Sequence, residues 1–166
     1  MTLSARVPGG VERNSIHESG HVVAARALGI EVSDVRISET GGLTNLPGLM
    51  ADPVREVAVR AAGEVAEVLA FGSPHADAAS SREDRAFAYQ AAFEATRDAG
   101  DAIRLEHDSR AFVRELLSDR WVDVEHVALA LLERGQLSGA QVADLVAVPG
   151  VPFRPGPPAN LASVAP

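Results

Sequence analysis

The sequence predicts a mainly α-helical protein that forms one domain, with a small β-hairpin next to its first helix. Apolar residues recur at helical spacing through most of the chain, and only one short stretch alternates as strands do. A chain of 166 residues can bury one substantial core. We therefore expect a helical domain over residues 11–148, a flexible N-terminus over residues 1–10 and a Pro-rich, disordered tail over residues 149–166.

The first two elements are a long helix and the hairpin. The helix is predicted over about residues 11–28 and ends at Gly29, because glycine commonly follows the last helical residue. After it, "EVSDVRIS" alternates apolar and polar residues imperfectly, "TGG" supplies a turn and "LTNL" can return as a second strand. The hairpin is thus expected to follow the first helix directly.

The rest of the domain is predicted to be helical. Gly72 ends the second helix, and Ser80 or Ser81 caps the third, which places Asp84 in its first turn. Ser138 is the expected cap of a short last helix. These helices are predicted within residues 54–72, 82–100, 101–118, 123–134 and 137–147.

Composition and charge exclude several classes of protein. The formal charge is −8, and the fifteen basic residues are scattered among twenty-three acidic ones, so we expect no nucleic-acid partner. No apolar run approaches the roughly 18 to 20 residues that span a bilayer, so we expect no membrane segment. The absence of cysteine excludes disulfides and thiolate ligands, and the N-terminus lacks a secretory apolar core. A cytoplasmic protein is the expectation.

The chemistry-bearing motif lies in the first helix, in "NSIHESGHVVAARALG". His17, Glu18 and His21 form the pattern H-E-x-x-H. Four residues along a helix leave the two histidines about 40° apart on one face, so both imidazoles can reach one zinc ion. Zinc lowers the pKa of a bound water toward about 7, and Glu18 can take its proton as general base. The motif therefore predicts a hydrolytic zinc site.

An alternative interpretation makes the same residues a helix start. Ser15 and Glu18 have the spacing of a capping box, and the histidines would then be exposed to solvent. Apolar residues such as Val22 continue beside the motif, which favours a buried helix instead. Gly20 costs about 1 kcal/mol inside a helix relative to alanine, which suggests that another backbone packs closely there.

A catalytic zinc site needs a third protein ligand, and spacing alone leaves it open. Asp84 also suits the positive end of a helix dipole, and Glu64 and Glu67 suit a hydrogen bond to a ligand histidine. The candidates are Glu64, Glu67, His75, Asp77, Asp84 and His107.

Four blocks of the chain, in order, resemble the peptidase domain of FtsH-type, membrane-anchored, ATP-dependent zinc proteases. The family patterns are H-E-x-G-H, A-G-R-x-A-E-x-x-x-F-G, a Ser-x-Asp-Leu-x-x-Ala segment and a closing A-x-x-L-L-E-x-E-T-L-x-G segment. The matching blocks are "HESGH", "AGEVAEVLAFG", "SSREDRAFAYQAA" and "ALALLERGQLSGAQVADLV". The resemblance implies a helical, zincin-like metallopeptidase domain, and it makes Asp84 the third zinc ligand beside His17 and His21.

The chain departs from this family at three places. Glu64 stands where the family has arginine, Arg85 stands where it has leucine, and Gly135 with Gln136 replaces Glu-Thr. Membrane segments, a phosphate-binding loop and an ATPase domain are also absent from the sequence. We therefore expect the peptidase module alone.

The implied function is that of a zinc metalloendopeptidase that cleaves peptides or unfolded segments without using ATP itself. A separate ATPase is the expected partner for folded substrates, and the hairpin can hold a substrate as an added strand or serve as a structural flap. Relatives form hexameric rings, but a homo-oligomer and a monomer both remain open. The alternatives are a noncatalytic helical interaction module, or hydrolysis of a bond other than a peptide by the same site.

Overall fold

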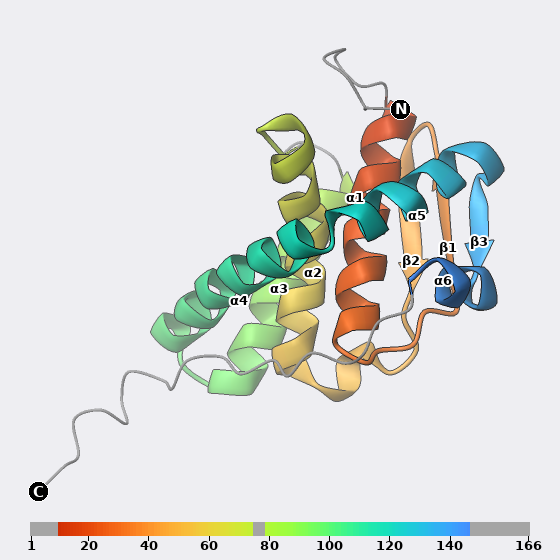
Figure 1. Ribbon diagram of the computed structural model, residues 1–166. Coiled ribbons are helices and arrows are strands. Elements are labelled where there is room, and N and C mark those ends of the chain that lie inside the picture. Colours follow the sequence, from red (N-terminus) through yellow and green to blue (C-terminus); the bar gives the residue numbers. More distant parts are fainter. Residues whose placement is uncertain (1–9, 75–78, 147–166) are drawn as a thin grey trace, which may run out of the picture.

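Helices make up most of the described chain, which comprises residues 10–74 and 79–146 of a computed structural model (Figure 1). A three-stranded antiparallel sheet accompanies them, so the mainly α fold with a hairpin is confirmed. In chain order the elements are α1 (Gly10–Ala27), β1 (Asp34–Ser38), β2 (Gly41–Asn45), η1 (Leu49–Ala51), α2 (Pro53–Phe71), α3 (Ala79–Thr96), α4 (Ala99–Asp119), α5 (Trp121–Arg134), β3 (Gln136–Ser138) and α6 (Gly139–Leu145).

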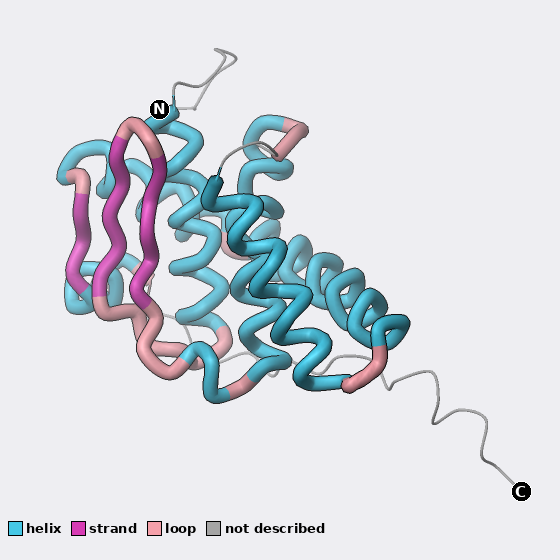
Figure 2. Tube along the Cα trace, turned by 180° about the vertical axis from the view of Figure 1, so that it is seen from behind, coloured by secondary structure: helices cyan, strands magenta, loops and turns pink. Residues whose placement is uncertain are grey.

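Helix α1 lies at the centre of the molecule. The sheet covers one side of it and α2 the other, and α3 and α4 pack on α2 (Figures 1 and 2). Helix α5 also packs on α1. All residues from 15 to 25 are consequently buried, polar ones included. A motif within this stretch must find its partners inside the protein.

The boundaries of α1 and α2 follow the local signals. Gly29 and Gly72 adopt the left-handed conformation that ends each helix. Asp52 caps α2 by accepting hydrogen bonds from the backbone N–H groups of Val54 and Arg55, with Pro53 at the first helical position. Both predicted helices are therefore confirmed.

The sheet contains one strand more than predicted. The hairpin of β1 and β2 is confirmed, and β3 adds to the opposite side of β1, so that the strand order is β2-β1-β3. Strand β2 is left at the edge of the sheet. Ser138, the last residue of β3, also caps α6 through a capping box with Gln141, as the predicted short helix requires.

The start of α3 differs from the prediction. Because the helix already includes Ala79, Ser80 and Ser81 lie in its first turn instead of capping it. Asp84 therefore lies in the second turn, where the effect of the helix dipole is weak. The favourable interaction of a first-turn carboxylate with the helix dipole therefore does not account for Asp84 at this position.

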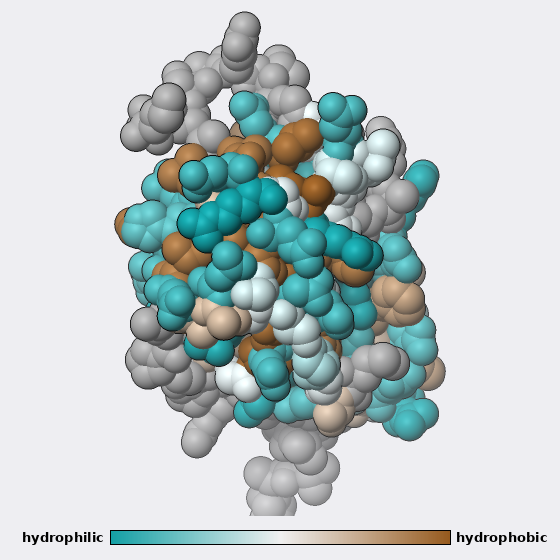
Figure 3. Space-filling model, turned by 90° about the vertical axis from the view of Figure 1, so that its right-hand side faces the viewer, coloured by the Kyte–Doolittle hydropathy of each residue, from teal (hydrophilic) through white to brown (hydrophobic). Residues whose placement is uncertain are grey.

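Some predictions concern residues beyond the described chain. Apart from Gly10, which begins α1, the predicted N-terminus of residues 1–10 and the tail of residues 149–166 lie outside the described residues. Within residues 10–74 and 79–146, no helix combines the length and hydrophobicity that crossing a lipid bilayer requires. On the side that carries β3 and α6, hydrophilic and hydrophobic side chains are interspersed (Figure 3).

Candidate metal centre

The three motif residues are buried in the middle of α1. His17 and Glu18 are each 3% exposed, and His21 is 6% exposed. The capping-box alternative is wrong, because α1 begins at Gly10 and the hydroxyl of Ser15 donates to the Glu12 carbonyl at 2.8 Å. The histidines are therefore held inside the protein, where each imidazole needs partners.

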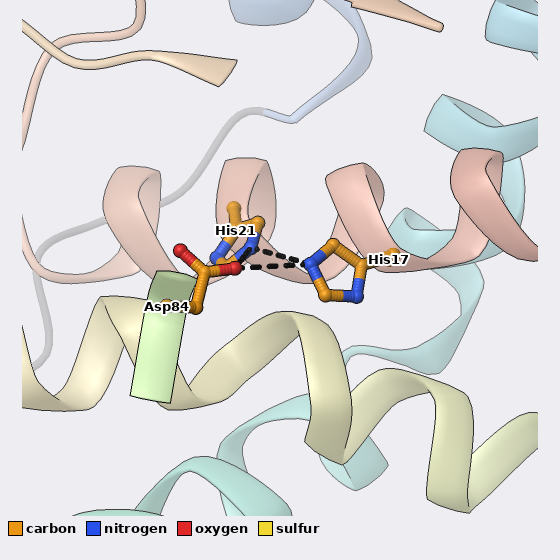
Figure 4. A group of neighbouring side chains, drawn as sticks. All are labelled: His17, His21 and Asp84. Carbon is orange, nitrogen blue, oxygen red and sulfur yellow. Dashed lines mark hydrogen bonds and ion pairs between the residues drawn. The ribbon is translucent and has the colours of Figure 1, made fainter. Parts of the chain in front are cut away.

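Asp84 provides the partner that both imidazoles share. Its Oδ2 atom lies 3.1 Å from Nε2 of His17 and 3.0 Å from Nε2 of His21, and the two Nε2 atoms are 3.1 Å apart. Figure 4 shows both rings leaving α1 while the carboxylate approaches from α3. Among the described residues these three form the one group of His, Asp and Glu side chains suited to hold a metal ion.

The donor triangle fits a zinc ion. A four-coordinate zinc ion with bonds of about 2.0–2.1 Å keeps its ligand atoms about 3.3 Å apart. The three observed separations of 3.0 to 3.1 Å need to expand only slightly to reach that value. Two imidazole nitrogens and one carboxylate oxygen are also a donor set that zinc accepts.

The other ring nitrogens are anchored so that Nε2 faces the triangle. Nδ1 of His17 lies 2.7 Å from Oε1 of Glu67, and Nδ1 of His21 lies 2.7 Å from the Val59 carbonyl oxygen. Arg13 donates to the second oxygen of Glu67 at 3.2 Å. With Nδ1–H donating in both rings, Nε2 is left as the ligand atom. The sequence left Glu67 open as a third ligand or as a hydrogen-bond partner of a ligand histidine. Its contact with Nδ1 of His17 fits the second of these roles.

Glycines in the two packed helices let the site form. A Cβ atom added at Gly63 of α2 would lie 2.5 Å from Nε2 of His17 and 2.6 Å from Nε2 of His21. One added at Gly20 would lie 2.5 Å from the Ala62 carbonyl oxygen. The close backbone approach predicted at Gly20 is thus confirmed.

The remaining third-ligand candidates lie elsewhere or cannot be placed. Glu64 is buried but pairs with Arg85 and with Arg110, the latter at 2.9 Å. His107 projects from α4 with 83% of its side chain exposed. His75 and Asp77 lie outside the described residues. Of the described candidates, Asp84 alone joins the two histidines.

Glu18 faces the edge strand β2. The Thr44 hydroxyl donates to its Oε2 at 2.6 Å. A Cβ atom added at Gly42, two residues earlier on the same side of the strand, would lie 2.4 Å from Cγ and 2.5 Å from Oε1 of Glu18. Thr44 thus holds the Glu18 carboxylate by a hydrogen bond, and the missing side chain of Gly42 leaves space for it.

A cavity of about 380 Å³ opens between β2, α2 and α3, and Glu18, His21 and Asp84 contribute to its wall. Arg60 also lines it, a residue that our sequence interpretation missed. The only sequence pattern that involves Arg60 is its spacing of four residues from Glu56. Such acid–base pairs are common on helix surfaces, so the pattern does not indicate a functional site. The other lining residues are Gly42, Leu43, Thr44, Asn45, Leu46, Leu49, Val59, Glu83 and Phe87.

The metal-free site holds a charged pair. Burial disfavours the imidazolium of His17, but hydrogen bonds to Asp84 and Glu67 and the nearby carboxylate charges outweigh burial and raise its pKa to about 10. Burial also disfavours the Asp84 carboxylate, yet the charges and hydrogen bonds of His21 and His17 hold its pKa well below the usual range. At neutral pH the positive charge of protonated His17 therefore compensates the negative charge of the Asp84 carboxylate.

Comparison of the chain with protein-family models and with curated proteins found no match. The functional proposal therefore rests on the geometry and chemistry of the site and on the four sequence blocks.

Proposed function

We propose that the protein is a zinc metalloendopeptidase with a zincin-like domain of the FtsH peptidase type. One observation carries the proposal: Nε2 of His17, Nε2 of His21 and Oδ2 of Asp84 converge within 3.1 Å, and His21 and Asp84 line a cavity that Glu18 also lines. No purely structural role requires a general base beside such a donor set.

The chain's residues divide the chemistry between them. His17, His21 and Asp84 would hold the zinc ion, which polarises a carbonyl group and acidifies water when bound. Glu18 takes a proton from the attacking water and returns it to the leaving amine. The Thr44 hydroxyl donates to Oε2 of Glu18 and so helps to hold the carboxylate in place.

The edge strand β2 supports a peptide substrate. Its residues 42–45 line the cavity, as does Leu46 just after it, and its outer edge is not paired within the described sheet. An extended peptide can add to such an edge through backbone hydrogen bonds, which hold the scissile bond straight. We infer that substrates are peptides or unfolded segments and that a separate ATPase would be needed for folded ones.

Two departures from the family pattern, Glu64 and Arg85, pair with each other. Glu64 and Arg85 form an ion pair between α2 and α3, and Arg110 of α4 adds a second cation to Glu64. An acidic residue in place of the family's arginine is thus matched by a basic one in place of its leucine. The change lies on α2 beside Gly63 and leaves the three donor atoms together.

The first test of the proposal is metal content. We expect about one zinc ion per purified wild-type chain and a marked loss in Asp84→Ala, measured by elemental analysis. Asp108→Ala, which removes a half-exposed carboxylate on α4, is the matched control and should keep its zinc. Wild-type protein that takes up no zinc even after incubation with it would contradict the proposal and favour the noncatalytic interaction module.

The second test is turnover. Glu18→Gln should bind zinc as the wild type does and lose peptide cleavage, whereas Glu12→Gln, on an exposed position of the same helix, should retain it. Cleavage is followed with a library of unstructured peptides, beside small esters and amides. Cleavage that survives Glu18→Gln would sink the mechanism, and activity on the small compounds alone would favour hydrolysis of another bond.

A further inference from the structure

The two oxygens of Asp84 have different partners. Oδ2 faces the imidazoles of His17 and His21, whereas Oδ1 accepts a hydrogen bond from Nη1 of Arg60 at 3.3 Å. Figure 4 shows the first oxygen between the rings and the second pointing away from them. One carboxylate oxygen is thus turned toward the donor triangle and the other is held by a cation of α2.

Arg60 is itself held on both sides. Its Nε and Nη2 atoms each lie 3.4 Å from Oε1 of Glu56, one turn earlier on α2. Its guanidinium stacks over the ring of Phe87, with Cζ 4.9 Å from the ring centroid. Phe87 lies one turn beyond Asp84 on α3, so the guanidinium spans both helices at the level of the site. Only 26% of the Arg60 side chain is exposed.

We propose that Arg60 is a positioning residue that makes Asp84 a one-oxygen metal ligand, by occupying Oδ1 so that Oδ2 alone faces the donor triangle. This inference rests on the metal site proposed above. It assigns Arg60 a role that neither the H-E-x-x-H motif nor the four sequence blocks contain.

The chemistry of the guanidinium suits this role. Its planar fork can donate to Glu56 and to Asp84 at once while its face packs on Phe87, and it keeps its charge at all relevant pH values. A lysine ammonium is a point charge that cannot reproduce this set of contacts. Without the cation, Oδ1 of Asp84 can rotate toward a bound ion, and the carboxylate can bind through both oxygens.

The experiment measures metal binding and coordination number in Arg60→Met. Outer partners of a ligand typically contribute 10- to 100-fold to metal affinity, so we expect Arg60→Met to weaken zinc binding by about that factor in a chelator competition. At saturating Co²⁺, four-coordinate sites absorb visible light more strongly than five-coordinate ones. We expect wild type to give the stronger spectrum and Arg60→Met the weaker one.

Two controls separate positioning from simple stabilisation. Arg55→Met removes a half-exposed cation of the same helix, paired only with Asp52 among the ion pairs of the described residues, and should change neither readout. Arg60→Lys, which keeps the charge, should restore part of the zinc affinity.

The outcomes are distinct. A wild type that binds neither Zn²⁺ nor Co²⁺ overturns the metal site and the inference with it. A wild type that binds both, with an Arg60→Met variant that matches Arg55→Met in affinity and spectrum, overturns the inference alone. If Arg60→Met does not fold, the test passes to Arg60→Lys, where an unchanged spectrum and affinity count against the role and a weaker spectrum supports it.

Discussion

Two glycines set how closely the reactive side chains can approach their neighbours. Gly63 of α2 faces the Nε2 atoms of both histidines, and Gly42 of β2 faces the carboxylate of Glu18. A side chain at position 63 would disturb the proposed metal ligands, whereas one at position 42 would disturb the proposed general base. Substitution of each glycine should therefore separate the two functions.

Gly63→Ala should lose zinc. The added methyl group would lie 2.5 Å from Nε2 of His17, so the imidazoles must move out of the donor triangle. We expect at least a tenfold weaker affinity in a chelator competition. Gly100→Ala, in the first turn of α4, is the control, and equal zinc affinity in the two variants would show that the backbone approach at Gly63 is irrelevant to the metal.

Gly42→Ala should keep zinc and lose turnover. Its methyl group would displace Glu18, since its three nearest atoms all belong to that side chain and none is a donor atom of the proposed metal site. We expect peptide cleavage to fall about 100-fold or more, the scale of a lost general base. The neighbouring Gly41→Ala, whose added Cβ meets nothing within 4 Å, should cleave as wild type does. Normal cleavage by Gly42→Ala would argue against Glu18 as the base.

Zinc affinity should rise with pH. In the folded, metal-free protein the pKa of His17 is raised from 6.5 to about 10, so metal binding at neutral pH must displace a proton. One displaced proton makes the affinity rise about tenfold per pH unit, which chelator competition at pH 6, 7 and 8 would measure. A pH-independent affinity would contradict it. Because the folded-state pKa of His17 is raised, the contribution of its protonated ring to stability is complete below about pH 6.5 and is lost as the pH rises through about 10, whereas the contribution of Asp84, whose pKa is lowered, is lost only in strong acid.

At the scale of elements, the crossing of α1 and α2 determines the site. Gly20 allows the two backbones to approach, and this approach brings Gly63, Val59 and Glu67 to the histidines. The Nδ1 partners of both histidine rings thus come from α2, a helix that is separate in sequence from α1. Any residue larger than glycine at position 20 should push this helix away.

Gly20→Ala should destabilise the protein. Alanine in a helix normally gains about 1 kcal/mol over glycine, but here the added Cβ would lie 2.5 Å from the Ala62 carbonyl oxygen and 2.7 Å from Cβ of Ala66. Overpacking of this kind costs about 1–3 kcal/mol. Urea unfolding of the metal-free protein measures the difference, and a more stable variant would mean that the crossing has room to spare.

Local signals predicted the helices and the paired histidines, and contacts between distant segments account for what they missed. The ends of α1 and α2 follow from Gly29 and Gly72, and the spacing of His17 and His21 follows from helix geometry. Strand β3 is three residues long and exists because it pairs with β1, which no local pattern reports. The partners of Arg60 and Glu67 likewise depend on helix packing. Spacing alone could not choose Asp84, and only the family resemblance singled it out.

At the scale of the whole molecule, the proposed metal joins the first helix to the third. His17 and His21 belong to α1 and Asp84 to α3, so a bound ion would restrain two elements that the chain separates by the β1–β2 hairpin, η1 and α2. A metal ion that binds only the folded state raises the free energy of unfolding of the whole domain by mass action.

Zinc should therefore raise the melting temperature of the protein. At a free zinc concentration one hundred times the Kd, the gain is about 2.7 kcal/mol, which amounts to several degrees for a domain of this size. Differential scanning calorimetry would show the shift in wild type and not in Asp84→Ala. Magnesium at the same concentration should have no such effect, because it prefers all-oxygen sites. An equal shift in Asp84→Ala would place the stabilising ion elsewhere.

The pairing of β3 with β1 has a consequence for biosynthesis. Residues 34–36 of β1 pair with residues 136–138, so the ribosome must add roughly a hundred residues after β1 before its second partner exists. Through that interval one side of β1 is an unpaired edge, open to other chains. Helix α1, which carries the two histidines, therefore leaves the ribosome well before the strand that completes the sheet beside it.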